Sequence, residues 1–388
     1  MFHIGLGGHL GPATRLGAVL SRQGHEVLAW GPAANRAQIE VEGVQFVEHE
    51  PLAVNEPFTS LLEFSANLAA ATDACVEEVI EELFDRDVEL VVHDLHVPWG
   101  RVASDFLGIP RIVSNPLFPE PNPTRPVTPA AGRERTYERV EAARLSIARK
   151  WGVELGDWNY AMTSTGSASV SYTTAHISGV TDVSEGWCYA GPLLGPSPSA
   201  VQDAEPPLVY VAFGTYFNTN AAIFKLVIAA LADEPVEVVV STGRSKVTAT
   251  ELEPLPSNVH LYDFVASREV LARARVHVTH AGCSSVHESL LAGVPMACLP
   301  LGSDQASWAQ RVADLGAGEV VDMWPNAVRA AVRGMLEDPR AAARARELGE
   351  QLVRYDGEAR VAAIVERELT GGVAGIPLRD AASRRASA

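Results

Sequence analysis

The chain has 388 residues, of which 47% are hydrophobic and 20% charged, so wholesale disorder is excluded and two or three domains are expected. Its 31 basic residues against 48 acidic ones give a formal net charge of −17. Because such a chain repels phosphate backbones and anionic lipid, we expect no nucleic-acid partner. One anionic ligand remains possible, since a helix N-terminus can bind phosphate without lysine.

Strand-like and helix-like segments alternate along the N-terminal half, which predicts an α/β fold with parallel sheets. Phe2 to Leu6 predicts a buried strand, and Pro12 to Gln23 predicts a helix with the proline near its first position. The segment HEVLAW after Gly24 predicts a second strand. Val88 to His93 is a short apolar run, typical of a parallel strand covered on both faces.

The stretch from Gly191 to Pro207 is rich in Pro, Gly and Ser and predicts a linker. After it, PLVYVAFGT begins a second series of strand, glycine turn and helix. We therefore predict two similar Rossmann-like domains facing each other across a cleft. The predicted bounds are 1–198 for the N-terminal domain, 199–207 for the linker, 208–370 for the C-terminal domain and 371–388 for a disordered tail.

His9 and Asp94 are polar residues that the sequence places at the carboxyl ends of two strands. Parallel strands end at one edge of a sheet, where ligands bind, so the two side chains can approach each other. A histidine that a carboxylate orients is a general base able to activate a hydroxyl. The glycines of GLGGHLGPA do not fit the dinucleotide fingerprint, because its sixth place is Leu10, and a nicotinamide oxidoreductase is therefore the disfavoured alternative.

Two other arrangements near this edge resemble metal sites. His93, Asp94 and His96 could be ligands, but alternation along a strand sends the first two to opposite faces. Asp85 and Asp87 follow an acidic helical segment, which favours a solvated helix end over a carboxylate pair that binds metal. We therefore expect no metal and no other cofactor.

The segment from Val276 to Gln305 carries the strongest pattern. VHVTH predicts a strand ending at His280, Gly282 predicts a turn, and Ser285-x-x-Glu288 fits a capping box that starts a helix. The start of that helix would aim backbone N–H groups at the cleft and form a diphosphate site without lysine. The next strand delivers Asp304 and Gln305 to the same edge, where a carboxylate and an amide can bind sugar hydroxyls.

Three further features bear on the compartment. The four cysteines form no CxxC pair, the N-terminus has no signal-peptide pattern, and no run of about 18 apolar residues occurs. We expect a cytoplasmic protein without a membrane span.

HAGCSSVHESLLAGVPMACLPLGSDQ resembles the donor-binding signature of family 1 glycosyltransferases, which have the GT-B fold. GHLGP is similar to the family segment carrying the catalytic histidine, VVHDLHVPWG to the segment carrying its partner aspartate, and VAFGT to the start of the C-terminal domain. The resemblance extends from about Phe2 to Leu369 and is greatest for bacterial enzymes that glycosylate macrolides and other natural products.

The resemblance implies roles at matching positions. His9 would deprotonate the acceptor and Asp94 would orient it, without a metal and with inversion at the anomeric carbon. The donor-binding residues would be Thr215, His280, Gly282, Ser284 and Ser285 for the diphosphate, Glu288 for the ribose, and Asp304 and Gln305 for the sugar. Phe264 and Val265 would border the nucleobase, and they depart from the family pattern, as does Trp308 in place of an asparagine.

The resemblance therefore predicts transfer of a sugar from a UDP- or dTDP-sugar to a hydroxyl of a macrolide, polyketide or phenolic. Loops around Pro51–Phe64 and Phe118–Tyr160 would bind this apolar acceptor, and a last helix near Asp356–Leu369 would cross back to the N-terminal domain. The alternatives are a GT-B sugar-nucleotide epimerase and a non-catalytic nucleotide-sugar-binding protein. The enzyme would be a monomer or homodimer.

Overall fold

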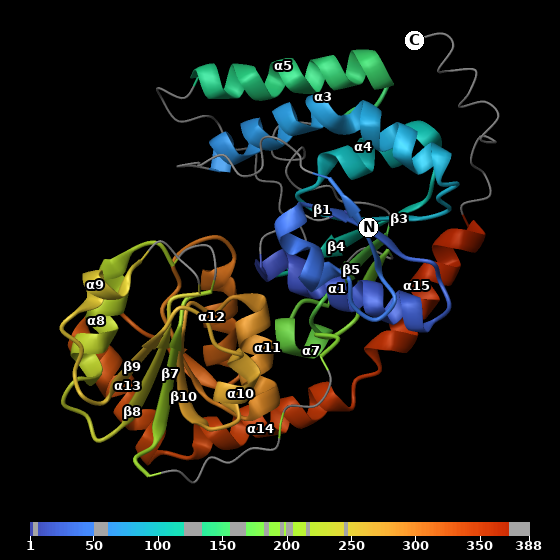
Figure 1. The fold of residues 1–388 in the computed structure, drawn as a ribbon. Helices are drawn as coiled ribbons and strands as arrows, with labels where there is room; N and C mark the ends of the chain where they lie inside the picture. Colours follow the sequence, from blue (N-terminus) through green and yellow to red (C-terminus); the bar gives the residue numbers. More distant parts are fainter. Residues whose placement is uncertain are drawn as a thin grey trace.

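The computed structural model describes residues 1–2, 7–49, 61–119, 134–155, 168–181, 186–194, 198, 205–214, 218–243 and 247–371. Two α/β domains lie against each other, each built on a parallel sheet (Figure 1). The predicted α/β class with two parallel sheets is confirmed. Thr215, residues 199–204 of the predicted linker and 372–388 of the predicted tail lie outside the described residues.

The N-terminal sheet has two groups of strands, which are linked by the first residues of the chain. Its strands are β1 (Leu28–Gly31), β2 (Gln45–Glu48), β3 (Val91–Asp94), β4 (Arg111–Asn115), β5 (Ala168–Ser171) and β6 (Trp187–Tyr189). Every pairing is parallel, in the orders β1-β2 and β3-β4-β5-β6. Phe2 forms parallel bridges to Trp30 and His93 and so links the two parts. Of the predicted first strand, residues 3–6 lie outside the described residues.

Helices cover both faces of this sheet. They are α1 (Gly7–Arg22), the 3-10 turn η1 (Ala33–Asn35), α2 (Arg36–Ile39), α3 (Leu61–Asp85), α4 (Pro98–Leu107), α5 (Glu134–Trp151) and α7 (Ala175–Ser178). Strand alternation directs Val91 into the cluster formed with α3, α4 and α5, and Val92 into the cluster formed with α1. The sequence pattern of a doubly covered strand is thus explained by a core on each face.

Helix α1 begins five residues before its predicted start, so Pro12 lies inside the helix and not at its first position. The prediction was wrong because a proline in the second helical turn gives up only one backbone hydrogen bond, a loss that burial of the apolar face can offset. That face includes Leu10, Leu16 and Val19, all almost fully buried. The early start also moves His9 from the end of a strand into the first turn of a helix.

The C-terminal sheet has six parallel strands. They are β7 (Leu208–Ala212), β8 (Glu237–Ser241), β9 (Val259–Tyr262), β10 (Ala274–Thr279), β11 (Met296–Cys298) and β12 (Gly318–Val320), in the order β12-β11-β10-β7-β8-β9. From β7 the chain proceeds through β8 and β9 to one side and from β10 to the other, so β7 and β10 flank the switch point. In open α/β sheets ligands bind beyond the carboxyl ends of the strands at such a point.

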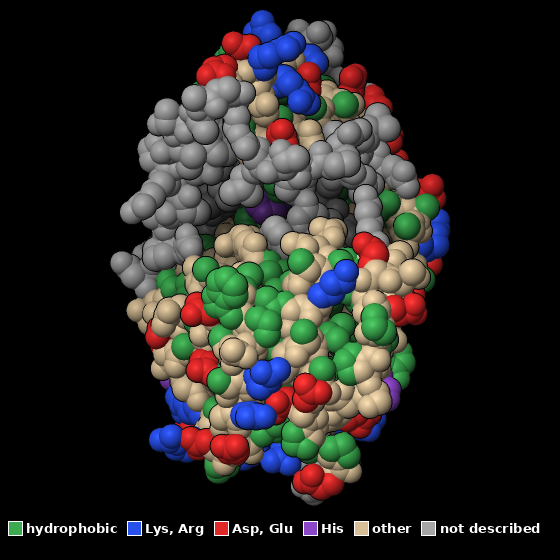
Figure 2. All heavy atoms as spheres, turned by 90° about the vertical axis from the view of Figure 1, so that its left-hand side faces the viewer, with side chains coloured by type: hydrophobic (Ala, Val, Ile, Leu, Met, Phe, Trp, Pro, Cys, Tyr) green, Lys and Arg blue, Asp and Glu red, His purple; other side chains and the backbone are tan. Residues whose placement is uncertain are grey.

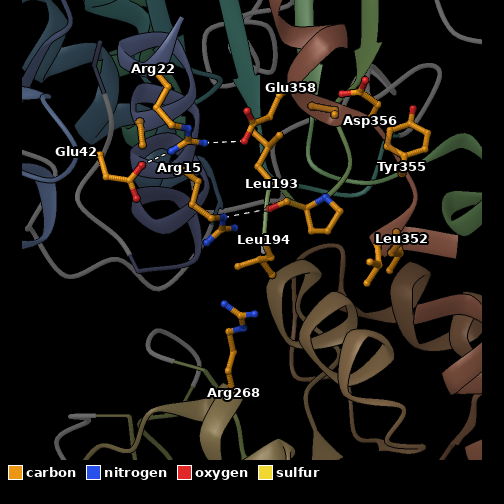
Figure 3. Close-up of a pocket in the computed structure, with 15 residues that line it drawn as sticks. Arg15, Arg22, Glu42, Leu193, Leu194, Arg268, Leu352, Tyr355, Asp356 and Glu358 are labelled. Atoms are coloured by element: carbon orange, nitrogen blue, oxygen red, sulfur yellow. Dashed lines mark hydrogen bonds and ion pairs between the residues drawn. The ribbon is translucent and has the colours of Figure 1, made fainter. Parts of the chain in front are cut away.

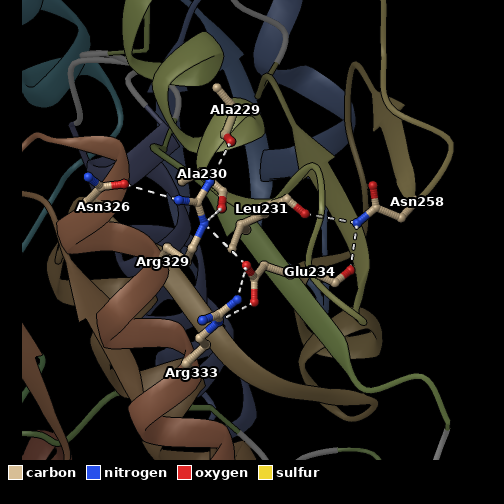
Figure 4. Close-up of polar contacts among 8 residues, drawn as sticks. All are labelled: Ala229, Ala230, Leu231, Glu234, Asn258, Asn326, Arg329 and Arg333. Carbon is tan, nitrogen blue, oxygen red and sulfur yellow. Dashed lines mark hydrogen bonds and ion pairs between the residues drawn. The ribbon is translucent and has the colours of Figure 1, made fainter.

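The helices of this half are α8 (Ala221–Leu231), α9 (Ala249–Leu252), α10 (Ser267–Leu271), α11 (Cys283–Ala292), α12 (Gln305–Asp314), α13 (Pro325–Glu337), α14 (Arg340–Val353) and α15 (Gly357–Gly371). A buried glutamate fixes α8 to α13 (Figure 4). Glu234 accepts two hydrogen bonds from Arg333, at 2.6 and 2.8 Å, and lies 3.2 Å from Nε of Arg329. Asn258 donates to the carbonyl groups of Leu231 and Val236 beside it.

Helix α15 leaves the C-terminal half and lies along the N-terminal domain, as the end of the chain shows in Figure 1. Its residues Val361, Ile364 and Val365 are buried in the same cluster as Leu16 and Val19 of α1. Gly357 at its start has no room for a side chain, because a Cβ atom would lie 1.8 Å from the carbonyl oxygen of Ala190. The first and last helices of the described chain therefore share one core.

Further contacts join the domains. Arg311 of α12 donates to the carbonyl oxygens of Ile177 at 2.8 Å and His176 at 2.7 Å. Gly179 ends α7 in the left-handed conformation, with φ +74°, and its lack of a side chain leaves space for the Arg311 guanidinium. Among the helices of the described part of the chain, none combines the length and apolar character needed to cross a membrane.

Candidate active site

His9 and Asp94 meet at the edge of the N-terminal sheet. Nδ1 of His9 lies 2.7 Å from Oδ2 of Asp94, and the carboxylate is completely buried while the imidazole is 13% exposed. The chain brings them together because α1 starts beside Phe2, whose strand pairs with β3, and Asp94 is the last residue of β3. The other carboxylate oxygen accepts a hydrogen bond from the backbone N–H of His96 at 2.8 Å. Asp94 is therefore fixed before it orients His9.

The electrostatics of the pair favour a charged couple. Burial lowers the pKa of His9, but the charge and hydrogen bond of Asp94, together with the charge of Asp304, outweigh it and raise that pKa above 6.5. Burial raises the pKa of Asp94, but the His9 charge and hydrogen bond outweigh it and hold that pKa below its usual value. In the neutral ring Nδ1–H donates to Asp94, so Nε2 is the nitrogen that can accept a proton.

The neighbouring histidines do not complete a metal site. His93 is buried on the other side of β3, where its Nδ1 donates to the carbonyl oxygen of Asp94 at 2.9 Å. The His96 ring lies 5.4 Å from the His9 ring. Asp85 and Asp87 are exposed at the end of α3. Within the described ranges, no group of three or more His, Cys, Asp or Glu residues could hold a metal ion.

The turn between β10 and α11 faces the same gap from the C-terminal domain. Ala281 takes the left-handed conformation, with φ 63°, and Gly282 is the extended N-cap residue, so the turn residue is one position earlier than predicted. No side chain caps α11, and Ser285 is its third residue, so the predicted capping box is wrong. The N–H groups of Cys283, Ser284 and Ser285 therefore have no partner from the helix itself, which is the arrangement that can bind an anion at a helix start.

His280 is packed against this turn. A Cβ atom on Gly282 would lie 2.6 Å from Nε2 of His280, and one on Gly214 would lie 2.7 Å from the same nitrogen. Two glycine backbones thus hold the imidazole at the switch point between β7 and β10. Burial lowers the pKa of His280 to about 4, so the ring is neutral and can donate or accept one hydrogen bond at each nitrogen.

Glu288 lies one turn further along α11, between cations from both domains. Burial raises its pKa, while the charges of Arg15 and Arg268 oppose this. Arg15 and Arg268 also line a pocket of about 450 Å³ beside the linker, and Figure 3 shows their guanidinium groups directed toward each other from α1 and α10. Arg15 is held there by a hydrogen bond from Nε to the carbonyl oxygen of Pro192 at 3.0 Å.

Asp304 and Gln305 stand at the start of α12. Oδ2 of Asp304 accepts hydrogen bonds from the backbone N–H of Phe118 at 2.7 Å and from Nε1–H of Trp308 at 3.0 Å. Oε1 of Gln305 accepts from the backbone N–H groups of Leu301 at 2.7 Å and Gly302 at 3.1 Å. Burial raises the pKa of Asp304, and the hydrogen bond from Phe118 opposes that rise. Because Phe118 follows β4, which pairs with β3, its hydrogen bond places Asp304 near the sheet edge at which Asp94 and His9 meet.

The surface is hollowed where these elements meet, and Figure 2 shows a histidine side chain exposed in the hollow between the domains. A histidine paired with a buried aspartate lies on one side of this junction. On the other side lie the uncapped start of α11 and the carboxylate and amide at the start of α12. This combination is suited to activating a hydroxyl against an anionic leaving group.

Comparisons with known proteins agree. Residues 192–347 match the family model described as UDP-glucoronosyl and UDP-glucosyl transferase. The chain is 23% identical to the NDP-glycosyltransferase YjiC of Bacillus subtilis, over 94% of this chain and 96% of that protein. Oleandomycin glycosyltransferase of Streptomyces antibioticus is 30% identical over 42% of this chain and 38% of that protein. The crystal structure of the kitacinnamycin glycotransferase aligns with a TM-score of 0.78 and 25% identity, covering 95% of this chain and 97% of that one.

These matches identify the chain as a glycosyltransferase that is similar to family 1 enzymes, with the family model itself matching residues 192–347. Its two parallel-sheet domains form the GT-B fold, as in the solved antibiotic glycosyltransferases it resembles. The recognition made from the donor signature and the expected fold are both confirmed.

Two predicted nucleobase neighbours of this glycosyltransferase follow β9. Phe264 is 55% exposed, while Val265 packs on the cluster that contains Leu208 and Tyr210. Ser267, the first residue of α10, has its Oγ 3.1 Å from the hydroxyl of Tyr210. Of the predicted acceptor loops, residues 51–60, 120–133 and 156–160 lie outside the described residues. The part from Glu134 to Trp151 is the helix α5, not a loop.

Sequence reasoning missed the residues of the glycosyltransferase that reach across the domain boundary. Arg15 and Arg268 belong to none of the predicted motifs, and Phe118 is predicted only as the start of an acceptor loop, not as a partner of Asp304. Phe118 follows β4 closely, so its position beyond the carboxyl end of a parallel strand was an available signal. Arg15 offered no such signal, because its charge interaction with Glu288 depends on how the domains pack.

Proposed function

We propose that the enzyme is an inverting, metal-independent glycosyltransferase that moves a sugar from a UDP- or dTDP-sugar to a hydroxyl of a hydrophobic natural product, such as a macrolide, polyketide or phenolic. The observation that supports it most is the 2.7 Å hydrogen bond between Nδ1 of His9 and the buried carboxylate of Asp94, which orients a candidate base at the edge of the N-terminal sheet. We expect it to act in the cytoplasm, where nucleotide sugars are made, as a monomer or homodimer.

The proposed step is a direct displacement. Nε2 of His9 takes the proton from the acceptor hydroxyl, and the oxygen attacks the anomeric carbon as the bond from that carbon to the diphosphate breaks. Asp94 stabilises the imidazolium that forms, because its carboxylate already accepts the Nδ1–H hydrogen bond at 2.7 Å. The sugar inverts because a single displacement occurs on the face opposite the leaving group.

The leaving diphosphate would be bound by the start of α11. Its uncapped N–H groups and the positive end of the helix dipole stabilise the charge that develops there. His280 and Thr215 would contact the same phosphates, and Glu288 would accept hydrogen bonds from the ribose hydroxyls. Asp304 and Gln305 would bind the sugar. No group in this scheme requires a metal or other cofactor.

The test is mass spectrometry of reactions that pair UDP- and dTDP-sugars with a panel of hydrophobic aglycones. The proposal expects a product heavier than the aglycone by one sugar residue. Parallel reactions without acceptor separate the alternatives, because an epimerase would convert the nucleotide sugar there and a transferase would not. Binding of nucleotide sugar with neither product would indicate a non-catalytic binding protein.

A further inference from the structure

We propose that Trp308 is a positioning residue for recognition of the donor sugar, acting through Asp304 together with the backbone N–H of Phe118. The inference rests on the proposed function in one respect, that Asp304 and Gln305 bind the transferred sugar. Trp308 stands where the family pattern has an asparagine, and the inference gives it a role in orienting Asp304.

Both hydrogen bonds to the Asp304 side chain are accepted by the same carboxylate oxygen. Oδ2 accepts from the N–H of Phe118 at 2.7 Å and from Nε1–H of Trp308 at 3.0 Å. A carboxylate oxygen offers about two acceptor positions, so Oδ2 is saturated and Oδ1 is the oxygen left for a ligand. Phe118 belongs to the N-terminal domain and Trp308 to α12, so both domains hold the carboxylate in one orientation.

Packing prevents the indole from leaving this position. The side chain of Trp308 is completely buried, and its ring meets Phe118 edge-on at 4.8 Å and His287 edge-on at 5.4 Å. Nδ1–H of His287 donates to the carbonyl oxygen of Cys283, and its Nε2 lies 2.9 Å from the Thr173 hydroxyl of the other domain. A buried indole does not touch the sugar, so its effect must pass through Asp304.

Gln305 is restricted in the complementary way. Its Oε1 accepts from the N–H groups of Leu301 and Gly302, which leaves its amide nitrogen as a donor. The pair thus offers a carboxylate oxygen that accepts and an amide that donates. A free sugar hydroxyl satisfies both, because it donates to Oδ1 and accepts from Nε2, whereas a hydrogen or a methoxy group at that position does not. The expected donor is therefore a nucleotide sugar with a free hydroxyl at the position that faces Asp304 and Gln305.

The experiment measures, by calorimetry, how tightly the wild type and Trp308→Phe bind four ligands: UDP-glucose, UDP, dTDP-glucose and dTDP. The affinity for each sugar nucleotide is compared with that for its bare diphosphate. Phenylalanine keeps an aromatic ring against Phe118 and removes the N–H donor. For the pair that the wild type binds, we expect affinity for the sugar nucleotide to fall about tenfold. Affinity for the bare diphosphate should stay within about twofold. Gln310→Ala, an exposed site on the same helix, is the matched control and should change neither affinity.

A second variant separates positioning from structural damage. In an Asp304→Ala background, adding Trp308→Phe should have no further effect on sugar-nucleotide affinity, because the residue through which it acts is gone. Additive losses, equal losses for sugar nucleotide and bare diphosphate, or no loss at all would overturn the inference. So would a wild type that binds the sugar nucleotides no more tightly than the bare diphosphates. Selective loss of sugar affinity in a protein without transfer activity would refute only the proposed reaction.

Discussion

Asp94 has one oxygen 2.7 Å from Nδ1 of His9 and the other 2.8 Å from the backbone N–H of His96. The carboxylate is completely buried, so one oxygen fixes its position on the backbone and the other holds the imidazole. The end of β3 and the turn that follows it therefore determine the orientation of the imidazole. This arrangement also distinguishes the two nitrogens of His9, because Nδ1 is bound to Asp94 and Nε2 is the one that can accept a proton.

Replacing His9 with alanine should lower kcat by about 10²- to 10⁴-fold, the usual contribution of a general base. Binding of the nucleotide sugar should be nearly unchanged, because the residues proposed to bind the donor lie on the other domain. Steady-state kinetics at saturating acceptor, with calorimetry for the donor, measure the two quantities. Transfer close to the wild-type rate would remove His9 from the role of base.

The pH dependence of kcat/KM should report the His9–Asp94 pair. The base must be neutral, so activity should rise with pH through the His9 pKa, which Asp94 and Asp304 hold above 6.5 against the effect of burial. In Asp94→Asn the charge is lost and burial dominates, so the acidic limb should move to lower pH while kcat falls about 10²-fold or more. An acidic limb that stays in place would assign it to another group.

Gly282→Ala should weaken donor binding by displacing His280. The new Cβ atom would lie 2.6 Å from Nε2 of the imidazole, closer than real contacts allow. A shift of about 1 Å at such a site raises the donor KM by roughly 10- to 100-fold. Gly334→Ala in α13 is the control, because a Cβ there meets nothing within 4 Å, and it should leave KM unchanged while raising Tm slightly.

Glu234→Ala should destabilise the C-terminal domain without changing donor or acceptor KM. The variant removes the acceptor for Arg333 and Arg329 at the contact between α8 and α13, away from the candidate site (Figure 4). We expect Tm to fall by about 2–6 °C, as measured by calorimetry. A changed KM with an unchanged Tm would mean that this contact influences the cleft.

Sequence patterns predicted the approach of His9 and Asp94 to each other more accurately than they placed the elements around the two residues. The donor signature and the strand-end rule indicated His9, Asp94 and Asp304, which depend on short stretches of chain. The start of α1 was placed too late because Pro12 was taken as a start signal, and the structure keeps it inside the helix. The capping box at Ser285 failed for a related reason, since Ala281 and Gly282 complete the turn before α11 without a side-chain cap.

Contacts between the domains were beyond the reach of local patterns. The hydrogen bond from Phe118 to Asp304 joins residues 186 positions apart, and the bond from His287 to Thr173 joins residues 114 apart. Neither pair shares a motif or a periodicity. Such contacts follow from the packing of two completed domains, which a sequence read segment by segment does not contain.

The placement of α15 has a consequence for biosynthesis. Val361, Ile364 and Val365 complete the core around α1, yet they lie near the end of the chain and are made after the whole C-terminal sheet. Domains usually fold in the order in which they emerge during translation. The N-terminal domain would then keep the apolar face beside α1 exposed until α15 has been made. A fragment ending at the linker should be prone to aggregate, and exchanging whole domains between such enzymes should require the last helix to travel with the N-terminal half.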